Sequence, residues 1–254
     1  AATPWEVETA VAASARALLD PSLKPSAASL GINCQNDADL AIACTLHGVR
    51  AGAALVHGTI NGFDMSTDLA AVIPALQLKM GLEVVPEDCL ADLTPLSRFV
   101  DEQSNQPHRN NQPFVGNSAF AHKGGIHVAA VLKNEDTYQH IQPTRVGNQR
   151  RILISELSGR GNIMSKIEEF GMLGPSAGAA KDAEWRERSG AILASVKDLE
   201  QKGYTFEGAD ASVELMIRRS LPGYTPPFQI TEFSVNSHDE RPTAERVRRW
   251  ATGA

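Results

Sequence analysis

Apolar and polar residues alternate near the start of the chain, and the pattern then changes to a helical spacing. Leu30, Ile32 and Cys34 are separated by single residues, which is the two-residue period of a strand. A stripe at helical spacing follows, made up of Ile42, Leu46, Val49 and Ala53. Residues 55–61 return to a strand-like pattern. Because a strand that returns through a helix to a second strand forms a parallel βαβ unit, we expect these two strands to pair in parallel.

The rest of the pattern is mainly helical. Helices are expected over 4–18, 69–80, 92–103, 181–202 and 210–221, and another begins near 158–160. Pro74 is expected to kink or interrupt the second of these helices, and Thr94 to cap the third. Short strands are predicted over 151–155 and 228–235. These elements together predict an α/β fold.

Polar side chains lie where the two N-terminal strands are expected to end. Asn33 and Gln35 end the first strand, and His57, Thr59 and Asn61 share one face of the second. In a barrel of βαβ units the C-terminal ends of the strands carry the chemistry. The neutral carboxamides of Asn33 and Gln35 suit hard ions but bind them weakly. We therefore favour the interpretation that these two polar side chains fill the end of a barrel over the interpretation that they bind a metal. A lone histidine is typical of a hydrogen-bonded core residue.

Composition narrows the class of protein. The chain has 254 residues, of which 42% are hydrophobic and 21% charged, enough for a sizeable core in one or two domains. A net charge of −6 and a pI near 5.7 argue against a nucleic-acid surface. We expect no signal peptide, and the sequence has no apolar run near the roughly 18 residues that a membrane span needs. Three cysteines without metal-type spacing predict reduced thiols in a cytoplasmic protein.

Several motifs carry a family resemblance. The chain contains NCQND at 33–37, GTING at 58–62, AHKGGIHVAAVLKN at 121–134 and SELSGR at 155–160. These motifs resemble those of the α-isopropylmalate, homocitrate and citramalate synthases, most closely the citramalate branch. That family consists of TIM-barrel acyltransferases. The resemblance therefore implies a partial TIM barrel, comprising its last strands and helices, followed by a mainly helical linker subdomain.

The resemblance also implies a division into domains. Residues 1–104 correspond to the C-terminal part of the barrel, 105–113 to a linker and 114–170 to the linker subdomain. Residues 171–227 form a helical segment that leads toward a regulatory domain, and 228–254 a strand and tail. The polar run SNQPHRNNQP at 104–113 independently favours the first boundary. Residues 171–180, rich in glycine and alanine, are expected to be a flexible link.

The family's catalytic residues map onto this chain with substitutions. The family's seventh strand carries two histidines that bind a divalent metal of the Mg²⁺, Mn²⁺ or Zn²⁺ type, and Asn33 and Gln35 occupy those positions. Its eighth strand continues into a Gly-Glu-Arg-x-Gly-Asn loop, which is shortened and rewritten here at 63–68. Thr59 and Asn61 fall at substrate-binding positions, and His127 at the position of a catalytic histidine. His122, five residues before His127, is at poor spacing for a metal pair.

The resemblance implies a Claisen-type condensation of acetyl-CoA with a small 2-oxo acid. Pyruvate is the first candidate for this acid, and the product would then be citramalate. In the family this reaction serves branched-chain amino-acid (isoleucine and leucine) biosynthesis, and the histidine at the position of His127 reaches into the neighbouring subunit. The expected partners are therefore the two small substrates and either a second copy, as a homo-oligomer (dimer), or a complete synthase. Neither nucleic acid nor membrane is expected as a partner.

Three interpretations stay open at this stage. The chain is part of a synthase whose other half lies elsewhere, a catalytically silent relative that serves as an interaction or regulatory subunit, or a fragment without function. The substituted metal positions and the rewritten loop predict that the chain alone is inactive. An incomplete barrel leaves strand edges and apolar faces uncovered, which predicts instability or association.

Overall fold

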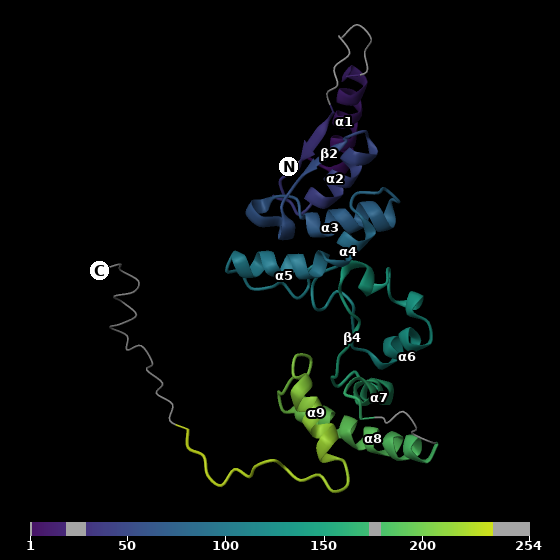
Figure 1. The fold of residues 1–254 in the computed structure, drawn as a ribbon, viewed down its shortest axis with the longest axis vertical. Helices are drawn as coiled ribbons and strands as arrows, with labels where there is room; N and C mark the ends of the chain where they lie inside the picture. Colours follow the sequence, from purple (N-terminus) through teal and green to yellow (C-terminus); the bar gives the residue numbers. More distant parts are fainter. Residues whose placement is uncertain (1, 19–28, 173–178, 236–254) are drawn as a thin grey trace, which may run out of the picture.

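The computed structural model describes residues 2–18, 29–172 and 179–235, with backbone alone at 179–184. The fold is a mixed α/β fold dominated by helices, with four short strands in the described part of the chain. Figure 1 shows an elongated arrangement, with α1 and α2 at one end, α7, α8 and α9 at the other, and α5 between them. No helix in the described ranges is long and apolar enough to cross a membrane.

The elements follow one another mostly through short connections. The strands are β1 (Gly31–Asn33), β2 (Leu55–His57), β3 (Ala121–His122) and β4 (Arg151–Ile152). The α-helices are α1 (Pro4–Leu18), α2 (Ala41–Arg50), α3 (Leu69–Pro74), α4 (Glu87–Ala91), α5 (Leu93–Gln103), α6 (Gly125–Lys133), α7 (Arg160–Glu169), α8 (Ala179–Gln201) and α9 (Asp210–Arg219). Tighter or wider helical turns are η1 (Ile60–Met65), η2 (Ala75–Lys79), η3 (Glu135–Thr137) and η4 (Pro143–Val146).

The expected parallel unit at the N-terminal end is confirmed. β1 and β2 pair in parallel, with Gly31 opposite Leu55 and Asn33 opposite His57, and α2 connects them. Gly48 of α2 lies directly over Ile32, and a Cβ at this glycine would overlap the Ile32 side chain. The helix therefore packs this closely on the strand because it has a glycine at the contact.

The predicted strand over 55–61 is wrong at its C-terminal end. β2 ends at His57, and Asn61 lies in the turn η1 with a left-handed φ of 67°. The chain reverses here because the Thr59 N–H donates to Thr67 O, and the Leu69 N–H donates to Thr59 O. These bonds use the backbone groups that a longer strand would have offered to β1, so the ladder stops.

The expected helices are present, whereas α4 and α6 were not expected, and one predicted cap is wrong. The break expected at Pro74 is confirmed, since α3 ends there and the wider turn η2 continues the chain. The expected cap at Thr94 is wrong, because Asp92 precedes α5 and Thr94 lies buried inside it. The Thr94 hydroxyl instead donates to Val146 O at 2.6 Å, which ties α5 to η4.

The C-terminal half contains a second short parallel pair. β3 and β4 pair in parallel, so the strand expected over 151–155 is confirmed but covers Arg151–Ile152 alone. The strand expected over 228–235 is wrong: this segment is extended and exposed, and no strand lies beside it in the described part of the chain. The expected link at 171–180 and tail at 236–254 fall largely outside the described residues.

Two apolar cores hold these elements together. The first joins α3, α4 and α5 to the segment after residue 113, through Ala70, Leu90, Leu93, Val115, Phe120 and Val146. It therefore contains residues from both sides of the predicted boundary at 105–113. The second lies among α7, α8 and α9 and includes Ile154, Ile163, Ile167, Ile192, Val196, Val213 and Ile217. The charged helix α8 is thus amphipathic, with its isoleucine and valine face in the core.

We expect Ile167→Ala to lower the free energy of unfolding by about 2–5 kcal/mol, because it leaves a cavity in the second core. Ile167 is fully buried, whereas Ile126 is 83% exposed. Ile126→Ala is the matched control and should change stability by no more than about 0.5 kcal/mol. Urea unfolding of both variants measures the difference, and equal effects would contradict the packing described here.

Candidate functional site

Asn33 and Gln35 project at the end of β1 without partners. Both are exposed, and neither carboxamide has a hydrogen-bond partner within the described ranges. The described residues contain no group of three or more histidines, cysteines or acidic side chains placed to hold a metal ion. Two exposed neutral carboxamides do not fit a divalent transition-metal site, which needs imidazole, thiolate or carboxylate ligands.

The rewritten loop after β2 folds back over the end of β1. The Asn36 N–H donates to Met65 O at 2.7 Å, and the Thr67 hydroxyl donates to Cys34 O at 3.0 Å. Asp64 and Met65 both take left-handed φ values of 56°, which permit this tight reversal. The loop therefore packs against the strand end at which Asn33 and Gln35 lie.

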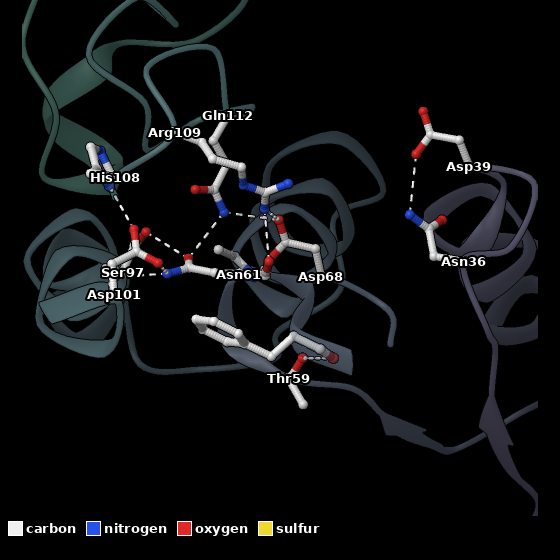
Figure 2. Close-up of polar contacts among 12 residues, drawn as sticks. Asn36, Asp39, Thr59, Asn61, Asp68, Ser97, Asp101, His108, Arg109 and Gln112 are labelled. Atoms are coloured by element: carbon white, nitrogen blue, oxygen red, sulfur yellow. Dashed lines mark hydrogen bonds and ion pairs between the residues drawn. The ribbon is translucent and has the colours of Figure 1, made fainter. Parts of the chain in front are cut away.

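Asn61 is the centre of a buried polar network, drawn in Figure 2. Its side chain is 6% exposed, and each of its two polar atoms makes two hydrogen bonds. Nδ2 donates to Ser97 O at 2.8 Å and to Asp101 Oδ1 at 2.7 Å. Oδ1 accepts from Ser97 Oγ at 2.6 Å and from Gln112 Nε2 at 3.0 Å. Protein groups thus saturate the Asn61 carboxamide, which is held between α5 and the segment at 108–112.

Asp68 extends this network toward α3. Its Oδ1 accepts from the Ala70 N–H at 2.9 Å and caps the helix, while its Oδ2 accepts from Gln112 Nε2 at 2.9 Å. Arg109 lies 3.7 Å from the same carboxylate and donates to Asn61 O at 2.7 Å. Burial raises the pKa of the Asp68 carboxyl, and the hydrogen bonds and the Arg109 charge offset this in part. The segment predicted as a linker therefore supplies two of the groups that hold the loop after β2.

His108 completes the network on the far side of Asn61. Its Nδ1 lies 2.8 Å from Asp101 Oδ2, and the Asp101 carboxylate is buried. The remaining ring nitrogen of His108 and the Gln112 carbonyl oxygen are buried without a partner in the described structure. The carboxylate of Asp101 thus accepts from a carboxamide on one oxygen and faces an imidazole on the other (Figure 2).

Sequence reasoning found Asn61 but missed the residues around it. Ser97 and Asp101 lie one turn apart on α5, but the sequence gives no sign that they are buried, since Leu96 and Phe99 of the same helix are exposed. His108 and Gln112 fall in the predicted linker at 105–113, because their neighbours are polar and rich in asparagine and glutamine. Nothing in that composition distinguishes a solvated linker from a segment whose carboxamides find buried partners.

A separate cluster surrounds His127, which is exposed at the start of α6. Its ring stacks on that of Tyr138 with 4.4 Å between centroids. His122 is buried on β3, and its Nε2 lies 3.5 Å from Gln139 Nε2. Burial, and then the charges of Arg150 and His127, lower the pKa of His122. No hydrogen bond or ring contact within the described ranges joins His127 to Asn33, Gln35, Thr59 or Asn61.

Thr59 is tied into the loop after β2 and not into the Asn61 network. Its hydroxyl donates to Phe63 O at 3.1 Å, and its backbone forms a parallel bridge with Asp68. Its oxygen keeps acceptor capacity for another donor. The three free cysteines form no disulfide, in agreement with the expectation of reduced thiols.

Known proteins similar to this chain fall in one group. Residues 114–183 match the family described as "Homocitrate synthase post-HMGL domain-like". The (R)-citramalate synthase of Aquifex aeolicus is 43% identical over 230 residues, which cover 87% of this chain and 42% of that protein. The (R)-citramalate synthase of Synechocystis is 45% identical over 210 residues, which cover 82% of this chain and 37% of that protein. The 2-isopropylmalate synthase of Sulfolobus acidocaldarius is 35% identical over 185 residues, which cover 72% of this chain and 45% of that protein. The chain spans less than half the length of these curated relatives.

Removing the Asn61 side chain should destabilise the fold. We expect Asn61→Gly to lower the free energy of unfolding by about 2–4 kcal/mol, because Asp101, Ser97 and Gln112 lose buried partners. Glycine tolerates the left-handed φ, so the loss reports on the carboxamide and not on backbone strain. The matched control is Asn105→Gly, at an exposed position with φ of 51°, which should be neutral or slightly stabilising. Equal losses in both variants would contradict the network.

Stability should fall as the pH drops through the range in which a histidine titrates. The folded chain disfavours protonated His122, so below about pH 6.5 the unfolded chain takes up the extra proton. Urea midpoints at pH 7.5 and 5.5 measure this slope. His122→Gln should reduce the slope and leave the part due to His140, whose pKa burial also lowers, whereas His57→Gln, at an exposed position on β2, should leave the slope in place. An unchanged slope in His122→Gln would contradict the assignment.

Proposed function

Because the chain belongs to the citramalate and isopropylmalate synthase family, we propose that it is the segment of an acyltransferase that condenses acetyl-CoA with a small 2-oxo acid. Pyruvate is the proposed acceptor and citramalate the product. The observation that carries this proposal is the identity of 43–45% to (R)-citramalate synthases over 82–87% of the chain. The 2-isopropylmalate synthase of Sulfolobus acidocaldarius reaches 35% over 72%.

We further propose that β1, α2 and β2 belong to the last strands and helices of a TIM barrel. The parallel register of β1 and β2 and the crossover through α2 support this placement. Polar residues at the C-terminal ends of both strands are also consistent with it. Residues 114–170 would then be the linker subdomain, in agreement with the family match that begins at residue 114.

His127 is the proposed acid–base group. In the condensation a base removes a proton from the acetyl methyl group, the resulting carbon attacks the 2-oxo carbonyl, and hydrolysis of the thioester releases CoA. The imidazole of His127 is exposed and held by stacking on Tyr138, so it can reach a substrate outside its own helix. By family resemblance that substrate would lie in the neighbouring subunit of a homo-oligomer (dimer).

Thr59 and Asn61 are the proposed substrate-side residues at the end of β2. The Thr59 oxygen can accept a hydrogen bond from a ligand. Asn61 can act by shaping the loop, since its carboxamide is fully used by protein groups. No step of this proposal runs through a metal ion, because Asn33 and Gln35, at the two expected ligand positions, do not fit a divalent transition metal.

A second candidate function is that of a catalytically silent subunit that binds a complete synthase. The loop at 60–68 favours it, since it packs on the end of β1 and is fastened by Asn61 and Asp68. Leu55 on β2 is 52% exposed and Trp5 on α1 is 66% exposed, so apolar surface is available for a partner. Both candidate functions predict that the chain alone does not catalyse the condensation of acetyl-CoA with pyruvate.

A thiol assay with acetyl-CoA and pyruvate tests these candidates. We expect the purified chain to release no CoA in a pyruvate-dependent way, because Asn33 and Gln35 stand at the two expected metal-ligand positions. The chain is then fused in place of the matching segment of the Aquifex aeolicus (R)-citramalate synthase, with and without Asn33→His and Gln35→His. The fusion with both histidines should be active, and the unrestored fusion at least about a thousandfold slower.

His127→Asn in the restored fusion should lower kcat by a further factor of about 10²–10⁴. Release of CoA by the unrestored chain alone would contradict the silent-site proposal. A restored fusion that accepts a branched 2-oxo acid but not pyruvate would contradict the citramalate assignment.

A further inference from the structure

A polar cleft lies between α5, β4 and the helices α6, α7 and α9. Its volume is about 530 Å³, and residues from α5, β4, α6, α7 and α9 line it. Figure 1 shows β4 running between α5 and α7, with α9 beside them. The charged residues of its lining are Arg98, Arg150, Arg151, Glu168, Glu169 and Asp210. Neither the proposed reaction nor the Asn61 network uses this cleft.

Three guanidinium groups supply unused donors to the cleft. Arg98 donates to the neutral Asn117 Oδ1 at 2.8 Å, and this is its sole partner within the described ranges. Arg150 pairs with Glu135 at 2.7 Å, and Arg151 with Asp210 at 3.1 Å. Each arginine side chain has five N–H donors and uses one of them in the bond described above. The other donors are available to an acceptor in the cleft.

Most of the carboxylates around the cleft are already neutralised. Lys166 is 1% exposed and pairs with Asp210 at 2.9 Å and with Glu169 at 3.0 Å. Burial alone would raise the pKa of the Asp210 carboxyl, but Lys166 and Arg151 outweigh burial and hold it below its usual range. Glu168 is the one lining carboxylate without an ion pair in the described structure.

The backbone that presents the arginines is fixed. The Asn148 carboxamide donates to Phe114 O at 2.9 Å and to Gly116 O at 3.0 Å, and its oxygen accepts from the Gln149 N–H at 2.8 Å. Asn148 is 6% exposed, so these bonds are protected from water. The segment that carries Arg150 and Arg151 is therefore preorganised, which lowers the ordering cost of binding.

We propose that this cleft binds a phosphate group. Guanidinium groups match the oxygens of a tetrahedral oxyanion with paired hydrogen bonds, and three of them here come from two separate elements. The volume suits a small phosphorylated metabolite. Leu132 of α6 also lines the cleft, so a bound ligand contacts the helix that bears His127. The proposal does not depend on the acyltransferase assignment.

Calorimetric titration of the full chain with inorganic phosphate at low, constant ionic strength tests the proposal. Arg98→Gln should weaken phosphate binding by about tenfold or more, because a charge-assisted donor pair is lost. Glu168→Gln should tighten binding by about threefold, because an unpaired like charge is removed. Arg145→Gln is the control for net charge, since Arg145 pairs with Glu87 outside the cleft, and it should leave binding unchanged.

Malonate and ADP in the same titration define the ligand class. Malonate should bind more weakly than phosphate. If inorganic phosphate binds more tightly than ADP, the cleft is a site for free phosphate; if ADP binds more tightly, it is a site for a nucleotide phosphate. Any of these results would overturn the proposal: no heat with a chain that unfolds cooperatively, equal binding by Arg98→Gln, or malonate binding as tight as phosphate. Weakening by Arg145→Gln as large as that by Arg98→Gln would do the same, because the effect would then be non-specific.

Discussion

The carboxamide of Asn61 is the contact on which the middle of this structure depends. It fastens the turn after β2 to α5 through Ser97 and Asp101, and to the segment at 108–112 through Gln112. Buried carboxamides are stabilising when every donor and acceptor is paired and costly when one is not. The parallel pair, α5 and the segment before the second half of the chain are thereby held in one arrangement.

The parallel pair was predictable because its signals are local. Alternation at 30–34, a helical stripe and a second short apolar run are each read within a few residues. The network around Asn61 was not predictable in the same way, because Ser97, Asp101 and Gln112 meet it only in the folded chain. The polar run at 104–113 has the composition of a linker, yet Gln112 is 2% exposed there. The strand expected at 228–235 failed for a related reason: its apolar residues are suited to a strand, but the described fold provides no neighbouring edge.

The same contacts bear on chemistry. Asn33 and Gln35 occupy the two positions expected to bind a metal, and the loop beside them is fastened by hydrogen bonds of Thr67, Asp68 and Asn61. The His127 ring stacks on that of Tyr138, and no hydrogen bond or ring contact within the described ranges joins it to this region.

A double-mutant cycle between Asn61 and Gln112 tests the central claim, that the turn after β2 and the segment at 108–112 are coupled through buried hydrogen bonds. The free energies of unfolding of Asn61→Gly, Gln112→Ala and the double variant are compared with that of the parent chain. The structure predicts a coupling energy of about 1–3 kcal/mol, because the Gln112 Nε2 to Asn61 Oδ1 contact of 3.0 Å is buried. Additive losses, with coupling near zero, would contradict it.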